Sequence, residues 1–141
     1  MVYAAGEIHS EWRDELRGYL EAVNVEAEII GPQEQHDRSD SVGEDILGAQ
    51  PNARYRDLIG ARVNTLRTRV LMQRADLCLA FFGPKYKQWN AAFDAGYAAA
   101  LNKPLIIMHN DDYQHALKEV DATAFAVTKN VEEVVNILKY T

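Results

Sequence analysis

The stretch 75–108 constrains the fold of this chain more than any other part of the sequence. It opens with a continuous apolar run, which is typical of a strand buried on both faces of a parallel sheet. A short loop with Gly83 and Pro84 follows, then a helix rich in small residues, then Pro104 and a second apolar run. This order predicts a β-loop-α-β unit. The one acid of its helix, Asp94, is expected near the carboxyl end of the sheet, where open α/β folds bind ligands.

The rest of the chain repeats this alternation of strands and helices. Apolar runs bounded by turn residues predict further strands, and apolar residues at helical spacing predict helices. The long helix after Asn52 is predicted to bury one apolar face, formed by Tyr55, Leu58, Ile59, Val63, Leu66 and Val70. The further predicted strands lie at 2–5, 25–30 and 124–128, and the predicted helices lie at 12–23, 52–70, 112–120 and from 131 onward.

Polar residues mark the ends of these elements. The side chains of Ser and Asn accept hydrogen bonds from the free backbone N–H groups at the start of a helix. Caps of predicted helices are therefore expected at Ser10, Asn52, Asn90 and Asn130. The segment 32–51 is polar and has no clear period, so it is predicted to be a loop. A loop of that length inside a compact domain is uncommon and often functional.

Length and charge bound the classes of protein that this chain can represent. Its 141 residues fit one domain, 1–141, that is large enough to bury a core. The formal charge of −6 argues against a nucleic-acid or anionic-membrane partner, because both require a basic surface. The only cysteine, Cys78, lies in an apolar run and is expected in the core. With neither an apolar span nor a leader pattern, a cytoplasmic location is expected.

Several motifs resemble the nucleoside 2-deoxyribosyltransferase superfamily. The stretch 90–98, followed by the strand at 102–106, is similar to its G-T-A-[large]-E-[x]-G-Y-A helix and G-K-P-V-I strand, and 3–6 is similar to its Y-[x]-A-G turn. Within that superfamily the chain most resembles the YtoQ family. The patterns that carry this resemblance are AGEIHS at 5–10, HDRSD at 36–40, GEDILG-x-QPNA at 43–53 and KYKQWN at 85–90.

The resemblance implies a fold and an assembly. It implies a flavodoxin-like, Rossmann-like α/β sandwich with a five-stranded parallel sheet in the order 2-1-3-4-5, which is also a common arrangement for alternating strands and helices. Strands one and three are then neighbours, and the loops that follow them flank one crevice. Superfamily members form homo-oligomers and need no cofactor, so a dimer or larger assembly acting on a small nucleoside or nucleotide is expected.

The resemblance also assigns roles to two residues. Asp94 matches the carboxylate that attacks the anomeric carbon of deoxyribose, and Tyr3 matches a tyrosine that bonds to that carboxylate. Without the family resemblance, each residue has a second interpretation. Asp94 could be an acid that complements the helix dipole, and Tyr3 could be an aromatic residue of the core. The chain departs from the family where Asp replaces Glu at 94, and where Gln88 and Thr68 replace two auxiliary acids.

Glu7 and His9 directly follow the first predicted strand and are the candidates for proton transfer. A second carboxylate could bind a sugar hydroxyl or act as an acid, and a histidine titrates near neutrality. The alternative for both is hydrogen bonding within the loop and capping of the next helix. Metal binding is not expected at any of these positions.

The remaining candidates are predicted to bind substrate. Arg38 and Ser39 could hold a phosphate or sugar hydroxyls, with His36 paired to Asp37, and Trp89 could stack on a nucleobase. The alternatives are a solvated turn over 36–40, a metal site that includes Glu44, and a core role for Trp89. The predicted substrate-binding residues are Gly6, His36, Asp37, Arg38, Ser39, Asp40, Gly83, Trp89 and Asn90.

Two other functions fit the sequence. Without the auxiliary acids, the domain could be a non-catalytic module that senses a nucleotide or a nucleotide-sugar. An unrelated hydrolase built on Glu7, His36 and Asp37 is the other possibility. The favoured function is cleavage or transfer at an N-glycosidic bond through a carboxylate nucleophile.

Overall fold

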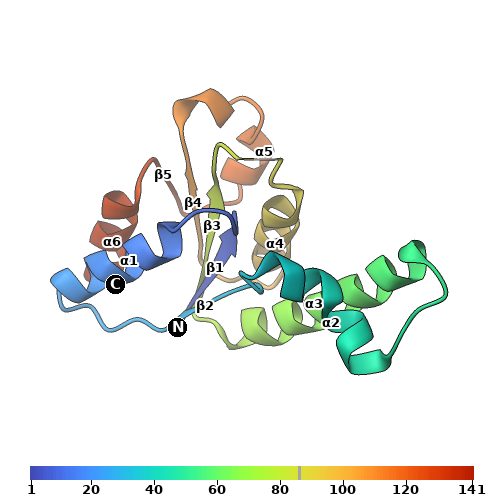
Figure 1. Ribbon diagram of the computed structural model, residues 1–141. Helices are drawn as coiled ribbons and strands as arrows, with labels where there is room; N and C mark the ends of the chain where they lie inside the picture. The colour runs from blue at the N-terminus through green and yellow to red at the C-terminus, as the bar shows by residue number, and fades with distance from the viewer. Residues whose placement is uncertain (86) are drawn as a thin grey trace.

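The computed structural model describes residues 1–85 and 87–141, and a parallel five-stranded sheet runs through its centre (Figure 1). The strand order β2-β1-β3-β4-β5 confirms the predicted 2-1-3-4-5 arrangement. The strands are β1 (Val2–Gly6), β2 (Ile29–Ile30), β3 (Leu77–Phe82), β4 (Leu105–His109) and β5 (Ala126–Thr128). The helices are α1 (Trp12–Ala22), α2 (His36–Leu47), α3 (Ala53–Arg74), α4 (Trp89–Ala100), the short 3₁₀ turn η1 (Asp111–Tyr113), α5 (Lys118–Asp121) and α6 (Val131–Tyr140).

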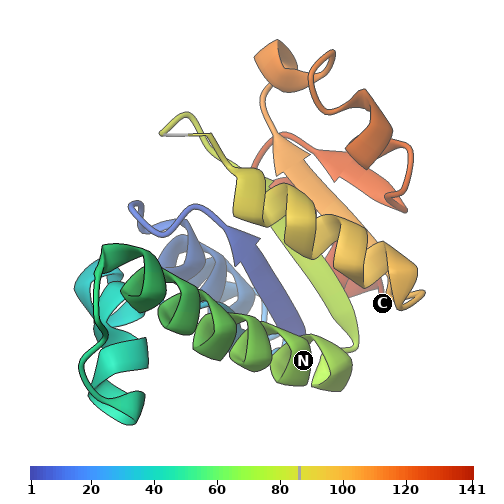
Figure 2. The same cartoon turned by 90° about the vertical axis from the view of Figure 1, so that its right-hand side faces the viewer.

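Helices cover both faces of the sheet, and Figure 2 shows α3 and α4 together on one of them. Successive residues of a strand point to opposite faces. Val2 and Ala4 of β1 therefore join a core with α1 and α6, whereas Tyr3 and Ala5 join a core with α3 and α4. The second core receives Ala91, Ala95 and Ala98 from α4, whose small side chains let that helix lie close to the strands.

The prediction of a loop over the whole of 32–51 was wrong, because this segment contains the helix α2. The described part of α2 buries one residue, Gly43, and so shows no apolar stripe. Gly43 lies against Gly60 of α3, where an added Cβ would overlap the Gly60 backbone. The helix is therefore stabilised by close packing of two backbones, a contact between distant residues that local periodicity does not reveal.

Some helix ends confirm the predicted caps and others do not. The Asn52 side chain accepts a hydrogen bond from the Tyr55 amide at 3.2 Å, and the Asn130 side chain accepts one from Glu133 at 2.9 Å. The prediction that Ser10 and Asn90 cap helices was wrong. Helix α1 begins at Trp12 after Glu11, and α4 begins at Trp89, one residue before Asn90.

Two other predicted elements are shorter than expected. The strand predicted at 25–30 is reduced to Ile29–Ile30, which pairs with Val2 and Tyr3 at the edge of the sheet. The helix predicted at 112–120 is split into η1 and α5. Among the described residues, no helix is both long and apolar enough to cross a membrane.

The helices α2 and α3 form a hairpin that extends away from the sheet (Figure 1). Only the last turns of α3 approach the sheet, where Met72 is fully buried. The predicted apolar face of this helix is largely uncovered. Four of its members, Tyr55, Leu58, Leu66 and Val70, are exposed.

Candidate functional site

A cleft of about 640 Å³ opens between the carboxyl ends of β1 and β3 and the helices α2, α3 and α4. This is the place where parallel sheets of this topology bind ligands, because the chain leaves β1 and β3 toward opposite faces. Of the predicted site residues, those that line it are Gly6, Glu7, His9, His36, Ser39, Asp40, Trp89, Asn90 and Asp94. Four others, Tyr3, Asp37, Arg38 and Gly83, are not among the described residues that line the cleft.

Asp94 lies in the second turn of α4 and is only 8% exposed. The fully buried Tyr3 donates its hydroxyl to Asp94 Oδ2 at 3.5 Å, and the Tyr3 oxygen lies 3.2 Å from Thr68 Oγ1. Burial raises the pKa of Asp94 to about 6, and the Tyr3 hydrogen bond opposes this rise without cancelling it. At neutral pH the arrangement therefore presents an ionised, poorly solvated carboxylate at the cleft wall.

This shifted pKa predicts a pH-dependent stability. Between the unfolded value of 3.8 and about 6, the native state holds a proton that the unfolded state has released, so stability falls as pH rises through that range. The loss amounts to about 3 kcal/mol at most. Asp94→Asn should therefore be more stable than the wild type at pH 8 by roughly 2–3 kcal/mol, and nearly equal below pH 4, in urea unfolding. A difference that is independent of pH would contradict this prediction, and the cleft variant Asp57→Asn is its control.

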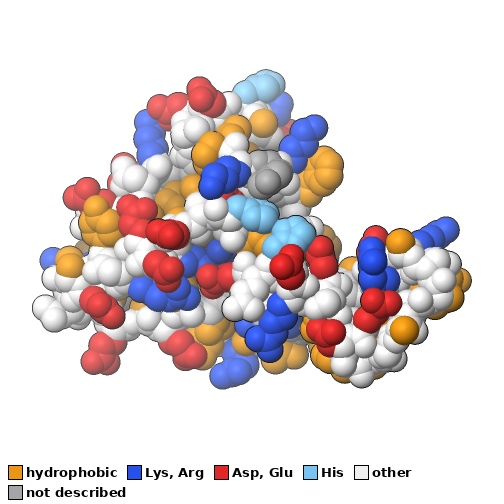
Figure 3. All heavy atoms as spheres, viewed as in Figure 1, with side chains coloured by type: hydrophobic (Ala, Val, Ile, Leu, Met, Phe, Trp, Pro, Cys, Tyr) orange, Lys and Arg blue, Asp and Glu red, His pale blue; other side chains and the backbone are white. Residues whose placement is uncertain are grey.

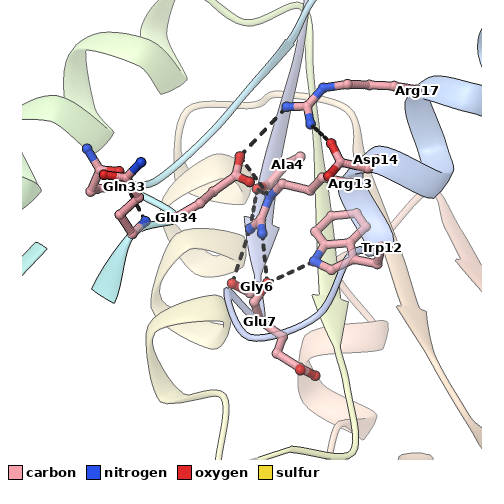
Figure 4. A network of polar contacts seen from close by, with 10 residues as sticks. Ala4, Gly6, Glu7, Trp12, Arg13, Asp14, Arg17, Gln33 and Glu34 are labelled. Atoms are coloured by element: carbon pink, nitrogen blue, oxygen red, sulfur yellow. Dashed lines mark hydrogen bonds and ion pairs between the residues drawn. The ribbon is translucent and has the colours of Figure 1, made fainter. Parts of the chain in front are cut away.

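The loop after β1 is held by a buried arginine, as Figure 4 shows. Arg13 is 2% exposed and donates hydrogen bonds to the carbonyl oxygens of Ala4, Gly6 and Glu7, at 2.7–3.2 Å. Trp12 Nε1 also donates to Glu7 O, at 2.8 Å. Burial lowers the pKa of Arg13, whereas nearby Glu34 opposes that shift. These bonds fix the backbone from which the Glu7 side chain projects.

The Glu7 side chain points away from this network (Figure 4) and is 2% exposed. Neither of its carboxylate oxygens has a hydrogen-bond partner among the described residues. Gly83 makes room for this carboxylate, because a Cβ at that position would overlap Glu7 Oε2. Gly83 was predicted to bind substrate, whereas in the structure its lack of a side chain makes room for the Glu7 carboxylate.

The histidines His9 and His36 meet at the cleft, with ring centroids 5.5 Å apart, and Figure 3 shows adjoining histidine side chains on this face. His36 Nδ1 lies 3.3 Å from Asp40 Oδ2, one helical turn further along α2. The described ion pair of His36 is thus with Asp40 and not with Asp37. Among the described residues, no group of three or more His, Cys, Asp or Glu side chains could hold a metal ion.

The wall of the cleft that α3 contributes was not predicted from the sequence. Asn64 Nδ2 donates to Ser39 O at 2.9 Å and lies 3.2 Å from Ser39 Oγ, which ties α3 to α2 beside the cleft. A pattern in the sequence could have revealed this wall, because small and polar residues recur there at helical spacing. The members of this face are Asp57, Gly60, Ala61, Asn64, Thr65 and Thr68, and the charged Arg67 of the same helix also lines the cleft.

The wall formed by α4 also contains a residue that was not predicted. Phe93 lies one turn after Trp89, and both line the cleft while being largely exposed, at 60% and 75%. Lys87 Nζ lies 5.7 Å from the Trp89 ring centroid. The alternative core role for Trp89 is therefore excluded, and the two rings offer an apolar surface beside Asp94.

Comparison with known proteins supports the fold and the family that were predicted from the sequence. A family profile described as "Nucleoside 2-deoxyribosyltransferase YtoQ" matches residues 3–141. A relative from Bacillus subtilis (strain 168), named "Uncharacterized protein YtoQ", is 46% identical over 140 residues, which cover 99% of this chain and 95% of the relative. Among solved structures, a 2-deoxyribosyltransferase from Bacillus psychrosaccharolyticus is similar, with a TM-score of 0.57 and 14% identity over 96% of this chain and 90% of that chain.

Proposed function

Because this chain belongs to the YtoQ family of nucleoside 2-deoxyribosyltransferases, we propose that it cleaves the N-glycosidic bond of a nucleoside or nucleotide and transfers the sugar to water or to a second base. The observation that carries the proposal is Asp94, a buried carboxylate at the wall of the cleft with a tyrosine hydroxyl bonded to it. A carboxylate with this environment suits attack on a sugar, because it has few water molecules to lose before it bonds to carbon.

In this mechanism the Asp94 carboxylate attacks the anomeric carbon of the sugar. The bond from carbon to Asp94 oxygen forms as the bond to the base nitrogen breaks, and the base leaves with the bonding electron pair and gains a proton. Water or a second base then attacks the same carbon from the opposite side and releases Asp94. The configuration at that carbon is retained after these two displacements.

Glu7 and His9 are the proposed proton donors to the departing base. Both follow β1 directly and line the same cleft as Asp94. Gln88 and Thr68, at the positions of the family's auxiliary acids, also line the cleft, but neither side chain titrates in the range where a general acid works. Glu7 and His9 are therefore the better supported candidates for the group that protonates the departing base.

The other cleft residues are proposed to bind the substrate. Trp89 and Phe93 would stack against the base. Ser39 and His36 would bond to the sugar or its phosphate, and Asp40 would accept a hydrogen bond from a sugar hydroxyl. Gly6 keeps the end of β1 free of a side chain, and Asn90 faces the cleft from the first turn of α4. Arg38 has no place in this proposal, since it does not line the cleft among the described residues.

The test is incubation of the full chain with a panel of ribo- and deoxynucleosides and their 5′-monophosphates, with and without a second free base. Release of free base, or formation of a new nucleoside, is the expected result, detected by chromatography. Tight binding of a panel member without any release would favour the sensing module, which the absence of the two auxiliary acids supports.

Replacement of Tyr3 by phenylalanine should move the pH dependence of that reaction. The Tyr3 hydroxyl lowers the pKa of Asp94, so its loss raises that pKa further above about 6. The rate at pH 6 should then fall about tenfold, whereas the rate at pH 8, where Asp94 is still ionised, should change much less. The exposed Tyr19→Phe is the matched control, and an unchanged acid limb in Tyr3→Phe would contradict the role.

We also propose that the chain acts as a homo-oligomer. The exposed side chains Tyr55, Leu58, Leu66 and Val70 give α3 an apolar surface, and none of them is among the described residues that line the cleft. Light scattering should give the mass of a dimer or a larger assembly. Leu66→Asp should shift it toward the monomer, whereas Glu26→Gln should not, and a monomeric wild type would contradict the proposal.

A further inference from the structure

A second cavity, of about 470 Å³, lies on the α1 side of Glu7. Glu7 belongs to the walls of both cavities, and the second is otherwise formed by the start of α1 and by the loop after β3. The proposed reaction uses the first cavity and leaves this one without a role.

The second cavity contains hydrogen-bonding groups that the protein itself does not satisfy. Both carboxylate oxygens of Glu7 and the hydroxyl of Ser10 are buried without a partner among the described residues, and both residues line this cavity. A buried carboxylate without a partner is costly, and the cost is removed when a ligand donates hydrogen bonds to it. A ligand that fits these groups is therefore a hydrogen-bond donor, and a cation suits them best.

The rim of the cavity adds negative charge. Glu11 and Glu15 lie one turn apart at the start of α1, line the cavity, and take part in no ion pair among the described residues. Asp14 also lines it but is bound to Arg17. The one cation described in the lining is Lys85, whose ammonium group already donates to the His9 carbonyl oxygen at 3.0 Å.

The arrangement of these carboxylates distinguishes between kinds of cation. No three acidic or histidine side chains of the described residues gather closely enough to hold a metal ion, so the charge is spread over the cavity. The rings of Trp12 and Phe81, with centroids 5.1 Å apart, add apolar surface to the same wall. Carboxylates that do not converge on one point, together with apolar surface, match a molecule that has separated ammonium groups joined by methylene chains.

We propose that this second cavity binds a linear organic polyamine, with one ammonium group on Glu7 and Ser10 and another near Glu11 and Glu15. The buried ammonium group donates hydrogen bonds to the Glu7 carboxylate and the Ser10 hydroxyl. Its methylene chain passes the Trp12 and Phe81 rings to reach the rim. Because Glu7 also faces the first cavity, an occupied second cavity places a positive charge beside a candidate proton donor.

The experiment is a calorimetric titration of the full chain, in the absence of any nucleoside, with spermidine, putrescine, butylamine and Mg²⁺. Affinity should rise from butylamine to putrescine to spermidine, because each added ammonium group reaches another carboxylate. Glu7→Gln should weaken spermidine binding at least tenfold, and Ser10→Ala and Glu15→Gln should weaken it about two- to fivefold. The exposed Glu26→Gln, the same chemical change away from the cavity, should leave it unaltered.

Three results would overturn the proposal: no heat of binding at millimolar spermidine, equal binding by wild type and Glu7→Gln, or displacement of spermidine by equimolar Mg²⁺. Thermal melts of each variant separate lost binding from lost folding. Binding is read without substrate, and Asp94→Asn should bind spermidine normally, so a failure of the proposed reaction leaves this result intact.

Discussion

Asp94→Asn is expected to lower the rate of base release by roughly a thousandfold or more. The asparagine amide has nearly the same shape as the carboxylate and can still accept the hydrogen bond from Tyr3, but it has no charge with which to attack a sugar carbon. Since the variant should be more stable than the wild type at neutral pH, a loss of activity could not be ascribed to unfolding. The measurement is initial rate of base release at pH 8 for the best substrate of the panel.

The matched control for this variant is Asp57→Asn, which removes a carboxylate from the opposite wall of the same cleft. It should retain activity within about tenfold, because Asp57 is assigned no bond to the reacting carbon. A nucleophilic Asp94 also predicts a covalent sugar adduct on the α4 peptide, visible by mass spectrometry after rapid acid quenching. Near-normal rates in Asp94→Asn would remove the nucleophile from the mechanism, whatever the enzyme's substrate.

Gly6→Ala should destabilise the protein by about 3 kcal/mol or more. Gly6 ends β1 with a φ of 116°, a conformation that residues with a side chain rarely adopt. An added Cβ would also overlap the carbonyl oxygen of Phe81 on the neighbouring strand, and backbone atoms in the centre of a sheet cannot easily shift away. The measurement is the free energy of unfolding in urea.

The contrasting substitution is Gly18→Ala on the surface of α1. Its added Cβ meets nothing within 4 Å, and φ there is that of an ordinary helix. Alanine in place of glycine inside a helix should stabilise the protein by roughly 0.5–1 kcal/mol. If both glycine variants changed stability by the same small amount, the close approach of β1 and β3 at Gly6 would not be the constraint inferred here.

The parts of the site that depend on local pattern were predictable. The apolar run of β3, the loop after it and the small-residue helix α4 place Asp94 at the carboxyl end of the sheet, as expected from the sequence. Glu7 and His9 directly follow β1 and line the cleft beside it. Each of these positions follows from the alternation of strands and helices and from the neighbouring positions of β1 and β3.

The α3 wall of the cleft was missed for a physical reason. The apolar residues of α3 were expected to face the core, but the structure leaves three of them, Tyr55, Leu58 and Leu66, exposed. The side of α3 that faces the cleft is small and polar, as at Asn64 and Thr68. Apolar periodicity indicates that a helix has an apolar face, but it does not say whether the fold of this chain covers that face.

Sequence patterns suffice for the family of this protein, the order of its parallel strands and the place of Asp94, because period, turn residues and family motifs can be recognised along the chain. The other features of the site depend on how distant segments pack. The packing of α2 on α3, where Gly43 meets Gly60, accompanies a cleft wall to which α2 contributes His36, Ser39 and Asp40. Only the loop geometry at Gly83 shows that the Glu7 carboxylate is buried without a partner. Burial and hydrogen bonding depend on atoms that are distant along the chain, so no local pattern specifies them.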